Sequence, residues 1–588
     1  MSPTMARAVQ TITKILLLFS ASHATARPVS DAQQRDETPA VDLGYASYTG
    51  YHDATLDLDY FKGIRYAAPP TGQNRWMKPQ TPPKSDAPIA LNENWPPICP
   101  QAPPGGGGGF TIQNEDCLYL SVIAPPGAKD LPVLVWIHGG GYGGGSGSDD
   151  FAEMLINNER GFIVVPIQYR LGAFGFLSSA EVGQHGTPNV GLWDQEFALQ
   201  WVQDHIASFG GDATKVTVAG SSAGGGSVMT LAMAHGGTSG TSLFQNAITG
   251  SPFLPQQWPH DGPAPTAGYN ALATKVGCLA PGQDSPGDGS VLSCLRGVDS
   301  ATLQQANFDV TVAGPYGMWT FLPVTDGKYL VDRPSAQLLD GQVNGARILS
   351  TNNAAEGRGF VPETILTDDD FMAYIASLLP LMSAQDIQNV GATYAIDPVV
   401  PNAPLFATKG DEGPTAMNQS SLATGHQQRA FNLYAETTFV CPSYWLASAF
   451  ARQTGNAWHY QLSVPPAVHG LDLNGLLRDG YVVSPGLMSV SFRLAMQKIW
   501  GQFIMHNDPT LPEDIVAAIT AAGDNLDGAK SSMWPKWDTS SYAMLNMNMT
   551  FPAQDQPAVF SIANGYTWEA NRGKRCDAWA SVGSIVPE

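Results

Sequence analysis

Basic side chains are scarce in this chain of 588 residues, where 30 Lys and Arg stand against 51 Asp and Glu and leave a formal net charge of −21. Phosphate groups are bound by clustered Lys and Arg, so this balance argues against nucleic acid and anionic membrane surfaces as partners. Charged residues are few overall, at 14%, whereas 43% of the residues are hydrophobic. That apolar fraction is ordinary for a globular protein and excludes wholesale disorder, a collagen-like chain and a coiled coil.

Long hydrophobic runs are also missing. No apolar run is long enough for a membrane-spanning helix, which needs about 20 such residues. The amino terminus instead has the order of a secretory signal peptide, with two basic residues, the short apolar run 15–19 and small residues that end in an A-x-A site at 24–26. We therefore expect residues 1–26 to be a signal peptide and residues 27–588 to be a secreted, extracellular protein without stable membrane insertion.

Cysteine is limited to six residues, a set typical of an oxidising compartment. Six cysteines allow fifteen pairings. Spacing favours two local loops and leaves one long-range bond, namely Cys99–Cys117, Cys278–Cys294 and Cys441–Cys576. Glycosylation sequons at Asn418 and Asn548 agree with secretion.

Neither a repeat nor an interior linker divides the chain, because its low-complexity run, Gly105 to Gly109, is better explained as a loop between Cys99 and Cys117. Short apolar runs alternate with stretches of helical periodicity. The expected strands are 131–137, 162–169, 215–219, 244–249, 346–350 and 458–463, and the expected helices are 189–209, 223–234, 431–452 and 490–506. This alternation favours a single large α/β domain, with a mostly parallel sheet and helices on both faces.

A nucleophile elbow is predicted at Gly220-Ser221-Ser222-Ala223-Gly224, because this G-x-S-x-G sequence stands between an expected strand and an expected helix. The sharp turn strains the central Ser222, and side chains at the flanking glycines would collide with neighbouring elements. The amino end of the helix also directs backbone N–H groups at an oxyanion. Without that context, G-x-S-x-G in a glycine-rich chain is a common chance match.

A second motif, His138-Gly139-Gly140-Gly141-Tyr142, follows the expected strand 131–137. Consecutive glycines let the backbone approach a substrate and present N–H donors to its carbonyl oxygen, so we predict an oxyanion hole formed by Gly140, Gly141 and Ala223. The alternative is a flexible loop, which the nearby glycines 143–145 fit equally well. No G-x-G-x-x-G opens a helix and no G-K-[ST] occurs, which disfavours a dinucleotide or phosphate loop.

With these motifs, nearly the whole chain after residue 26 resembles the type-B carboxylesterase, cholinesterase and fungal lipase group of α/β-hydrolases. Matching segments are GIRYAAPP at 63–70, EDCLYL at 115–120, YRLGAFGF at 169–176, NVGLWDQ at 189–195 and FGGD at 209–212. The resemblance implies the α/β-hydrolase fold, a carboxylic-ester hydrolase with a Ser-Glu-His triad, no cofactor, and the two local disulfides. No residues are assigned to a metal. Two pairs, Arg75 with Glu115 and Arg170 with Asp194, resemble the family's buried ion pairs and are interpreted as structural.

Chain order in such folds is serine, acid, histidine. Glu356 follows an expected strand and matches the family's acid, whereas Glu412 is a local look-alike with no strand before it. His469 also follows an expected strand and matches the family's base, whereas His459 lies within that strand and is better explained as structural. His469 would take the proton of Ser222, and Glu356 would hold the imidazole. The neutral ring of His138 would orient the oxyanion motif.

The resemblance is weaker around the substrate. Ser221 stands where cholinesterase-like and fungal-lipase-like members usually have glutamate, and the Cys99–Cys117 loop is short, glycine-rich and without tryptophan. The loop is therefore expected to supply neither a lipase lid nor the aromatic face of a quaternary-ammonium site. A segment that aligns with the family's acyl pocket contains Gly317, which leaves room for a bulkier acyl group, and Trp319, which is a candidate lining residue or ordinary core. Tyr142 and Ser221 complete the candidate pocket.

These features predict a secreted serine carboxylesterase that hydrolyses uncharged carboxylic esters, small or lipid-like, through an acyl-enzyme. A biosynthetic-pathway esterase, a lactonase, a transesterase, and a lipase or sterol esterase use the same machinery, and only the pocket distinguishes them. A catalytically inactive adhesion protein of the same fold is disfavoured by the complete set of Ser222, Glu356 and His469. The sequence determines neither the physiological ester nor the oligomeric state.

Overall fold

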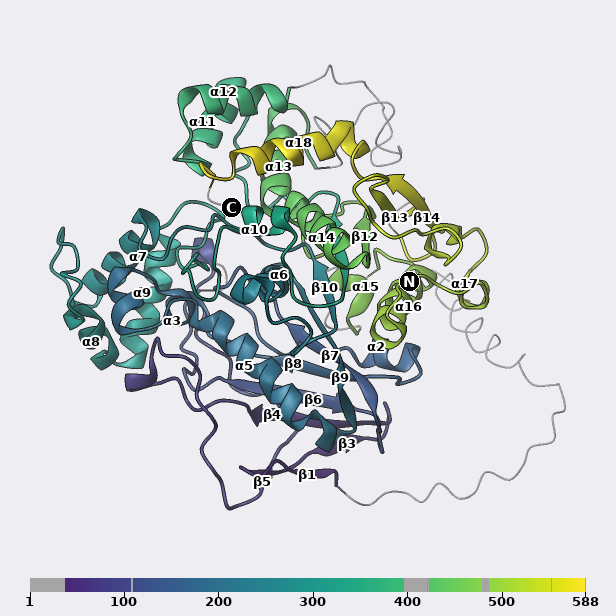
Figure 1. Ribbon diagram of the computed structural model, residues 1–588, viewed down its shortest axis with the longest axis horizontal. Helices are drawn as coiled ribbons and strands as arrows, with labels where there is room; N and C mark the ends of the chain where they lie inside the picture. The colour runs from purple at the N-terminus through teal and green to yellow at the C-terminus, as the bar shows by residue number, and fades with distance from the viewer. Residues whose placement is uncertain are drawn as a thin grey trace, which may run out of the picture. The chain divides into compact units, whose positions relative to one another are not determined.

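A central sheet of eleven strands organises the part of the chain that the computed structural model describes, namely residues 38–106, 109–395, 420, 422–478, 486–550 and 553–586. The strand order is β14-β13-β12-β11-β10-β9-β7-β8-β6-β4-β3 (Figure 1). The strands are β3 (Tyr51–Asp53), β4 (Leu58–Arg65), β6 (Tyr119–Ala124), β7 (Leu131–Ile137), β8 (Ile163–Ile167), β9 (Gly211–Ser221), β10 (Asn246–Gly250), β11 (Arg347–Asn353), β12 (Ala457–Leu462), β13 (Ala543–Met549) and β14 (Ala558–Asn564). The expected signal peptide, Glu412 and Asn418 lie outside the described residues.

The middle of this sheet is parallel and its two sides are antiparallel. Neighbours from β13 across to β8 run parallel, whereas β14 and the series β6, β4 and β3 pair antiparallel. The six expected strands correspond to β7 through β12, which confirms the predicted parallel sheet. A separate three-stranded sheet contains β1 (Ala40–Asp42), β2 (Ser47–Thr49) and β5 (Ile89–Ala90).

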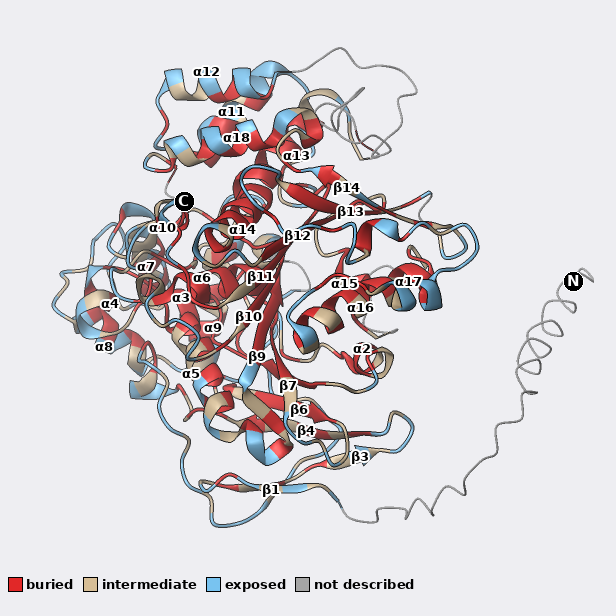
Figure 2. Cartoon of the chain, turned by 45° about the vertical axis from the view of Figure 1, so that its right-hand side comes forward, coloured by how far each residue is buried: buried red, intermediate tan, exposed pale blue. Residues whose placement is uncertain are grey.

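Both faces of the sheet are covered by helices. Successive side chains of a strand point to opposite faces, so each strand contributes to the hydrophobic cluster on either side. In β7, Val133, Val135 and Ile137 face one hydrophobic cluster and Leu134 and Trp136 face another. The first cluster includes residues of α5 (Val190–His205), α6 (Ala223–Gly237) and α14 (Cys441–Thr454), and the second includes residues of α2 (Ala152–Asn157) and α16 (Val490–His506). Figure 2 shows the resulting buried strands between helical layers.

The register of the parallel strands brings their carboxyl ends to one edge. Gly250, the last residue of β10, pairs with Ser221 of β9 on one side and with Thr351 of β11 on the other. Segments that follow these strands therefore begin side by side. In open α/β sheets this edge is where ligands bind.

The helix expected over residues 431–452 is present but begins earlier and contains a π-helical turn. The structure has α13 (Gly425–Ala435), a π-helical turn η4 (Glu436–Val440) and then α14. Pro442 has no N–H to donate to the carbonyl of Thr438, four residues earlier, and its ring would collide with that carbonyl in a continuous α-helix. The Thr438 carbonyl instead accepts a hydrogen bond from the backbone N–H of Leu254, at 2.9 Å.

Three disulfides are present, Cys99–Cys117, Cys278–Cys294 and Cys441–Cys576, in the pairing that spacing favours. The last of these joins α14 to the carboxyl-terminal helix α18 (Trp568–Val582) across 135 residues of chain. Within the described ranges, no helix combines the length and apolar character needed to cross a membrane.

Candidate active site

The candidate nucleophile, Ser222, lies at the junction of β9 and α6. Its φ of 60° and ψ of −125° fall in a region that residues with a side chain rarely adopt. A Cβ on Gly220 would lie 2.4 Å from the carbonyl carbon of Gly224, and one on Gly224 would lie 2.0 Å from the carbonyl oxygen of Ile137. The two glycines of the motif are therefore required by the close approach of β7, β9 and α6 at this turn.

One imidazole connects the candidate nucleophile to the candidate acid. The Nε2 atom of His469 lies 2.8 Å from Ser222 Oγ, and its Nδ1 atom lies 2.5 Å from Glu356 Oε2. Glu356 is fully buried, and its other oxygen accepts hydrogen bonds from the hydroxyl of Ser251 at 2.5 Å and the backbone N–H of Asn353 at 2.6 Å. These donors orient the carboxylate so that Oε2 faces the imidazole.

The acid and the histidine come from adjacent parallel strands. Glu356 follows β11 and His469 follows β12, and the two loops are joined by a backbone hydrogen bond from Ala355 N–H to Ala467 O at 2.9 Å. His459, inside β12, is fully buried against the hydroxyl of Ser443, at 3.0 Å. Burial and, to a smaller extent, the positive charge of Arg572 lower the pKa of His459 to about 3, so the ring is neutral.

The glycine motif packs against the serine turn. Gly140 and Gly141 have φ values of 109° and 64°. A Cβ on Gly139 would lie 2.7 Å from the carbonyl oxygen of Ser221 and 3.0 Å from Ser222 Cβ. Within the described part of the chain, no protein acceptor is recorded for the backbone N–H groups of Gly140 and Gly141. These donors are thus available to a ligand beside Ser222.

The buried ring of His138 holds the start of this loop in place. Its ring stacks on Tyr169, with the centroids 4.5 Å apart, and its Nδ1 lies 2.8 Å from the carbonyl oxygen of Gly139. Burial lowers the pKa of His138 to about 4. The neutral ring therefore donates its Nδ1 hydrogen to that carbonyl and holds the first glycine of the motif.

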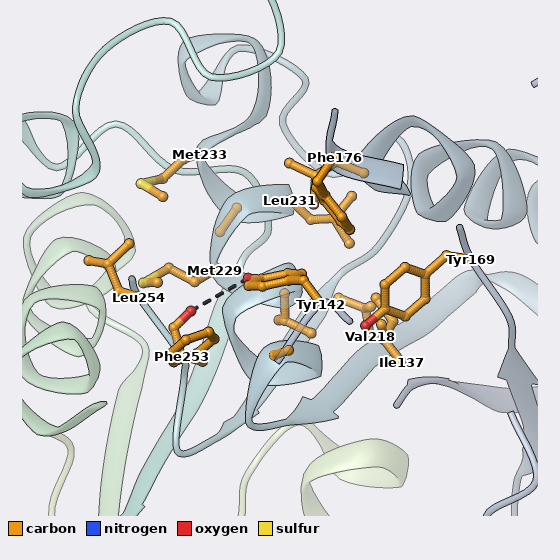
Figure 3. Close-up of a cluster of buried hydrophobic side chains, with 14 of the residues drawn as sticks. Ile137, Tyr142, Tyr169, Phe176, Val218, Met229, Leu231, Met233, Phe253 and Leu254 are labelled. Carbon is orange, nitrogen blue, oxygen red and sulfur yellow. Dashed lines mark hydrogen bonds between the residues drawn. The ribbon is translucent and has the colours of Figure 1, made fainter. Parts of the chain in front are cut away.

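Two expected pocket residues lie elsewhere. The ring of Tyr142 is buried in the core with Met229 and Phe253 (Figure 3), and its hydroxyl lies 3.5 Å from the carbonyl oxygen of Phe253. Ser221 is only 3% exposed. Neither residue lines the apolar cavity described next, because the motif turns both side chains into the protein interior.

An apolar cavity of about 320 Å³ is lined in part by residues of α13 and η4 and lies next to the glycine motif. Its lining includes Phe253, Met318, Trp319, Leu378 and Tyr434. The indole of Trp319 also contacts the oxyanion motif, because a Cβ on Gly141 would lie 2.0 Å from its ring carbons. Trp319 thus lines the cavity and touches the glycine loop.

Gly317 does not enlarge this cavity, contrary to expectation. Its φ is +69°, and a Cβ there would lie 2.2 Å from the carbonyl oxygen of Phe360. The glycine is needed for a tight turn against the Phe360 backbone.

Several residues around His469 carry no motif or periodic pattern that would have identified them. The ring of Phe439 lies 4.4 Å from the imidazole and that of Phe360 lies 5.2 Å from it. Asp472 is fully buried nearby, and burial, with the charge of Glu356 second, raises its pKa to about 6. Phe439 lies in the π-helical turn η4, which the apolar periodicity of the sequence does not reveal.

Two structural expectations concern ion pairs and metals. The Arg75–Glu115 and Arg170–Asp194 pairs form at 2.6 and 2.7 Å and are almost completely buried. Across the described ranges, no group of three or more His, Cys, Asp or Glu side chains is arranged to hold a metal ion.

The fold and the strained serine between strand and helix define an α/β-hydrolase. The chain belongs to the carboxylesterase family, whose model matches residues 41–559. It is therefore a carboxylic-ester hydrolase, as the motifs predicted.

Relatives cover most of the chain. It is 31% identical over 566 residues to carboxylesterase patB of Aspergillus clavatus, covering 87% of this chain and 95% of that protein. It is 32% identical over 558 residues to secreted triacylglycerol lipase LIP1 of Gibberella zeae, with 88% of each covered. An acetylcholinesterase of Bungarus fasciatus is 30% identical over 541 residues, with 85% and 80% covered. The solved structure of Aspergillus niger EstA matches 94% of this chain and 99% of its own, with a TM-score of 0.74 and 24% identity.

Proposed function

We propose that the protein is a secreted serine carboxylesterase that hydrolyses uncharged esters with Ser222, His469 and Glu356 as its catalytic triad. The observation that carries this proposal is a single imidazole within hydrogen-bond reach of both the serine hydroxyl and a buried carboxylate, at 2.8 and 2.5 Å. That arrangement is the recurring one for nucleophilic serine catalysis.

The reaction begins with proton transfer, because a serine hydroxyl is a poor nucleophile until a base removes its proton. His469 Nε2 takes the proton as Ser222 Oγ attacks the ester carbonyl, while Glu356 accepts the Nδ1 hydrogen and stabilises the imidazolium. Backbone N–H groups of Gly140, Gly141 and Ala223 donate to the oxyanion. His469 then protonates the leaving alcohol.

Water completes the cycle. His469 removes a proton from a water molecule, whose oxygen attacks the acyl-enzyme carbonyl. The bond to Ser222 Oγ breaks, the serine recovers its proton from the imidazolium, and the carboxylic acid leaves.

The apolar cavity supports an uncharged substrate. It is lined by side chains such as Met318, Leu378 and Phe253, and no Asp or Glu occurs among its described lining residues. Burying a charged group there without a partner would be costly. We therefore assign the acyl or alcohol portion of a neutral ester to this space.

Secretion is supported by the signal-like segment 1–26, by the three disulfides and by the resemblance to a secreted lipase. Disulfides persist in oxidising compartments. An acyl chain of lipid length is a second candidate substrate, favoured by the apolar lining of the cavity.

The test is covalent labelling with a fluorophosphonate, followed by peptide mapping. We expect the label on Ser222, and we expect Ser222→Ala and His469→Ala each to lower kcat on p-nitrophenyl butyrate by roughly 10⁴-fold or more, because members of a triad act as a unit. His52→Ala, on the edge strand β3, is the control and should retain full activity. A label on another serine, or more than a few per cent of activity in Ser222→Ala, would refute the assignment.

A further inference from the structure

The π-helical turn η4 lies directly beside the candidate triad. Phe439, in this turn, is fully buried and its ring centroid lies 4.4 Å from that of His469. The two preceding residues, Thr437 and Thr438, line the apolar cavity. A displacement of this short turn would therefore change both the cover of the imidazole and the shape of the cavity.

The same turn begins with a buried charge that the proposed chemistry does not use. Glu436 is 1% exposed, and its Oε1 accepts from Arg575 Nη2 at 2.6 Å and from Arg572 Nε at 3.3 Å. Its Oε2 accepts from Arg575 Nε at 2.7 Å and from the hydroxyl of Tyr394 at 2.7 Å. Burial alone would raise the pKa of Glu436, but the charges of Arg575 and Arg572 bring it below its ordinary value.

Both arginines belong to the carboxyl-terminal helix α18, which lies beside α13 (Figures 1 and 2) and is joined to α14 by the Cys441–Cys576 disulfide. Arg575 makes two hydrogen bonds with one carboxylate, a planar fork that fixes direction as well as distance. Arg575 also donates to the carbonyl oxygens of Glu569 and Ala570, so the guanidinium is itself held in place.

Arg572 reaches a second support of the site. Its Nη1 donates to Gln461 Oε1 at 2.7 Å, and the same oxygen accepts from Asn352 Nδ2 at 3.2 Å. Asn352 lies in β11, immediately before Asn353, whose N–H holds Glu356. The two arginines of α18 thus connect to both sides of the site. Glu436 begins the turn that packs on His469, and Gln461 is bonded to Asn352, next to the residue that holds Glu356.

We propose that Arg575 and Arg572 are positioning residues for the catalytic histidine: through Glu436 they hold the π-helical turn in the place where Phe439 packs on the imidazole of His469. This inference rests on the proposed function, because it concerns how well His469 serves as a base. The ring of Phe439 packs against the imidazole and so limits the positions that His469 can adopt. Loss of Arg575 would leave the buried Glu436 carboxylate with only the 3.3 Å contact to Arg572 and the hydroxyl of Tyr394, so the turn would shift to hydrate it.

The central experiment is Arg575→Met, which removes the charge and keeps the length of the side chain. We expect kcat per fluorophosphonate-titrated site to fall about tenfold, with KM changed by less than about threefold. A fall in kcat with little change in KM is expected because the ester still binds while the base that takes the serine proton is misplaced. The other charged groups near His469, Glu356 and Asp472, are unchanged in this variant.

Phe439→Ala tests whether the effect passes through the aromatic ring. It should lower kcat per titrated site by a similar factor, and the double variant with Arg575→Met should lower it no further, because both changes remove one contact. Arg575→Lys keeps the charge without the two parallel hydrogen bonds and should give a smaller loss of kcat.

The matched control is Arg75→Met, which breaks a similarly buried ion pair, with Glu115, away from η4. It should lower Tm without changing the kcat per titrated site or the KM. If Arg575→Met and Arg575→Lys behave like this control, the positioning role is wrong while wild-type ester hydrolysis and Ser222 labelling stand. Should the wild type hydrolyse no ester, the proposed function itself fails first.

Discussion

Asp472 is a buried carboxyl group whose ionisation opposes folding. Its Oδ1 accepts from Asn353 Nδ2 at 3.2 Å, and its Oδ2 has no hydrogen-bond partner among the described residues. Burial, with the charge of Glu356 second, raises the pKa of Asp472 from 3.8 to about 6. Because the folded protein then binds this proton more tightly than the unfolded chain does, the stabilising contribution is complete at low pH and is lost as pH rises toward 6.

Asp472→Asn should therefore be stabilised relative to wild type as the solution becomes less acidic. The difference in free energy of unfolding should grow from about pH 4 to about pH 6 and then stay constant, because the asparagine keeps the acceptor for Asn353 and never ionises. Urea unfolding at a series of pH values measures it. Asp57→Asn, whose side chain is 63% exposed, is the control. Parallel stability curves for wild type and Asp472→Asn would contradict the prediction.

Single site residues could be predicted where they belong to a local sequence motif or follow an expected strand. Ser222 lies in a motif, and Glu356 and His469 follow expected strands and match the acid and base of the family that the chain resembles, so the three residues could be named from the sequence. Tyr142 was misassigned because the direction of its ring depends on the left-handed φ of 62° at that residue, which turns the side chain into the core. Asp472 and Phe439 could not be found, since their importance comes from neighbours distant in the sequence.

At the scale of elements, the loop closed by Cys99 and Cys117 is held by hydrogen bonds in its described part. Gln101 accepts from the backbone N–H of Gly145 at 2.8 Å and donates to its carbonyl at 2.9 Å. Gln113 is joined to Gln304 of α9 (Ser300–Val312) by two hydrogen bonds, at 2.8 and 3.0 Å. The loop is thus tied on one side to Gly145, three residues after the glycine motif, and on the other to α9.

A loop held in this way does not serve as a mobile lid, so we expect no interfacial activation. The rate on tributyrin should rise smoothly with concentration and saturate, with no jump where the ester passes its solubility limit. The same series with p-nitrophenyl butyrate below its solubility limit provides the reference curve. A steep increase in rate at the onset of emulsion would show that a lid opens, and would favour the interpretation of the protein as a lipase.

Elements were predictable in the centre of the sheet and not at its sides. Strands β7 and β8 lie in the middle of the sheet, are buried almost along their whole length, and are continuous apolar runs that local sequence reveals. The side strand β14 alternates between buried and exposed residues over a short span, a weaker signal. The π-helical turn was missed because the apolar periodicity continues through it, and only Pro442 marks the break.

For the whole molecule, the net charge of −21 is the property most able to affect substrate choice at a distance. A negative protein attracts cations, but at physiological salt this attraction is screened beyond roughly 8 Å. Close to the site, a cation would need an aromatic face and a carboxylate that it can approach. Ser221 has no carboxylate, and none lines the described part of the cavity.

Butyrylcholine should consequently be no better a substrate than its neutral analogue 3,3-dimethylbutyl butyrate, although the two esters have the same shape. A cation–π contact contributes ~0.5–2 kcal/mol, and without a carboxylate the cost of dehydrating the ammonium cancels most of it. We expect the kcat/KM values to agree within about threefold at 0.15 M salt, and any preference for the cation at low salt to vanish as salt is added, because only long-range attraction produces it. A tenfold preference for butyrylcholine that persists at 1 M salt would mean that the aromatic lining of the cavity, including Trp319 and Tyr434, forms a cation site after all.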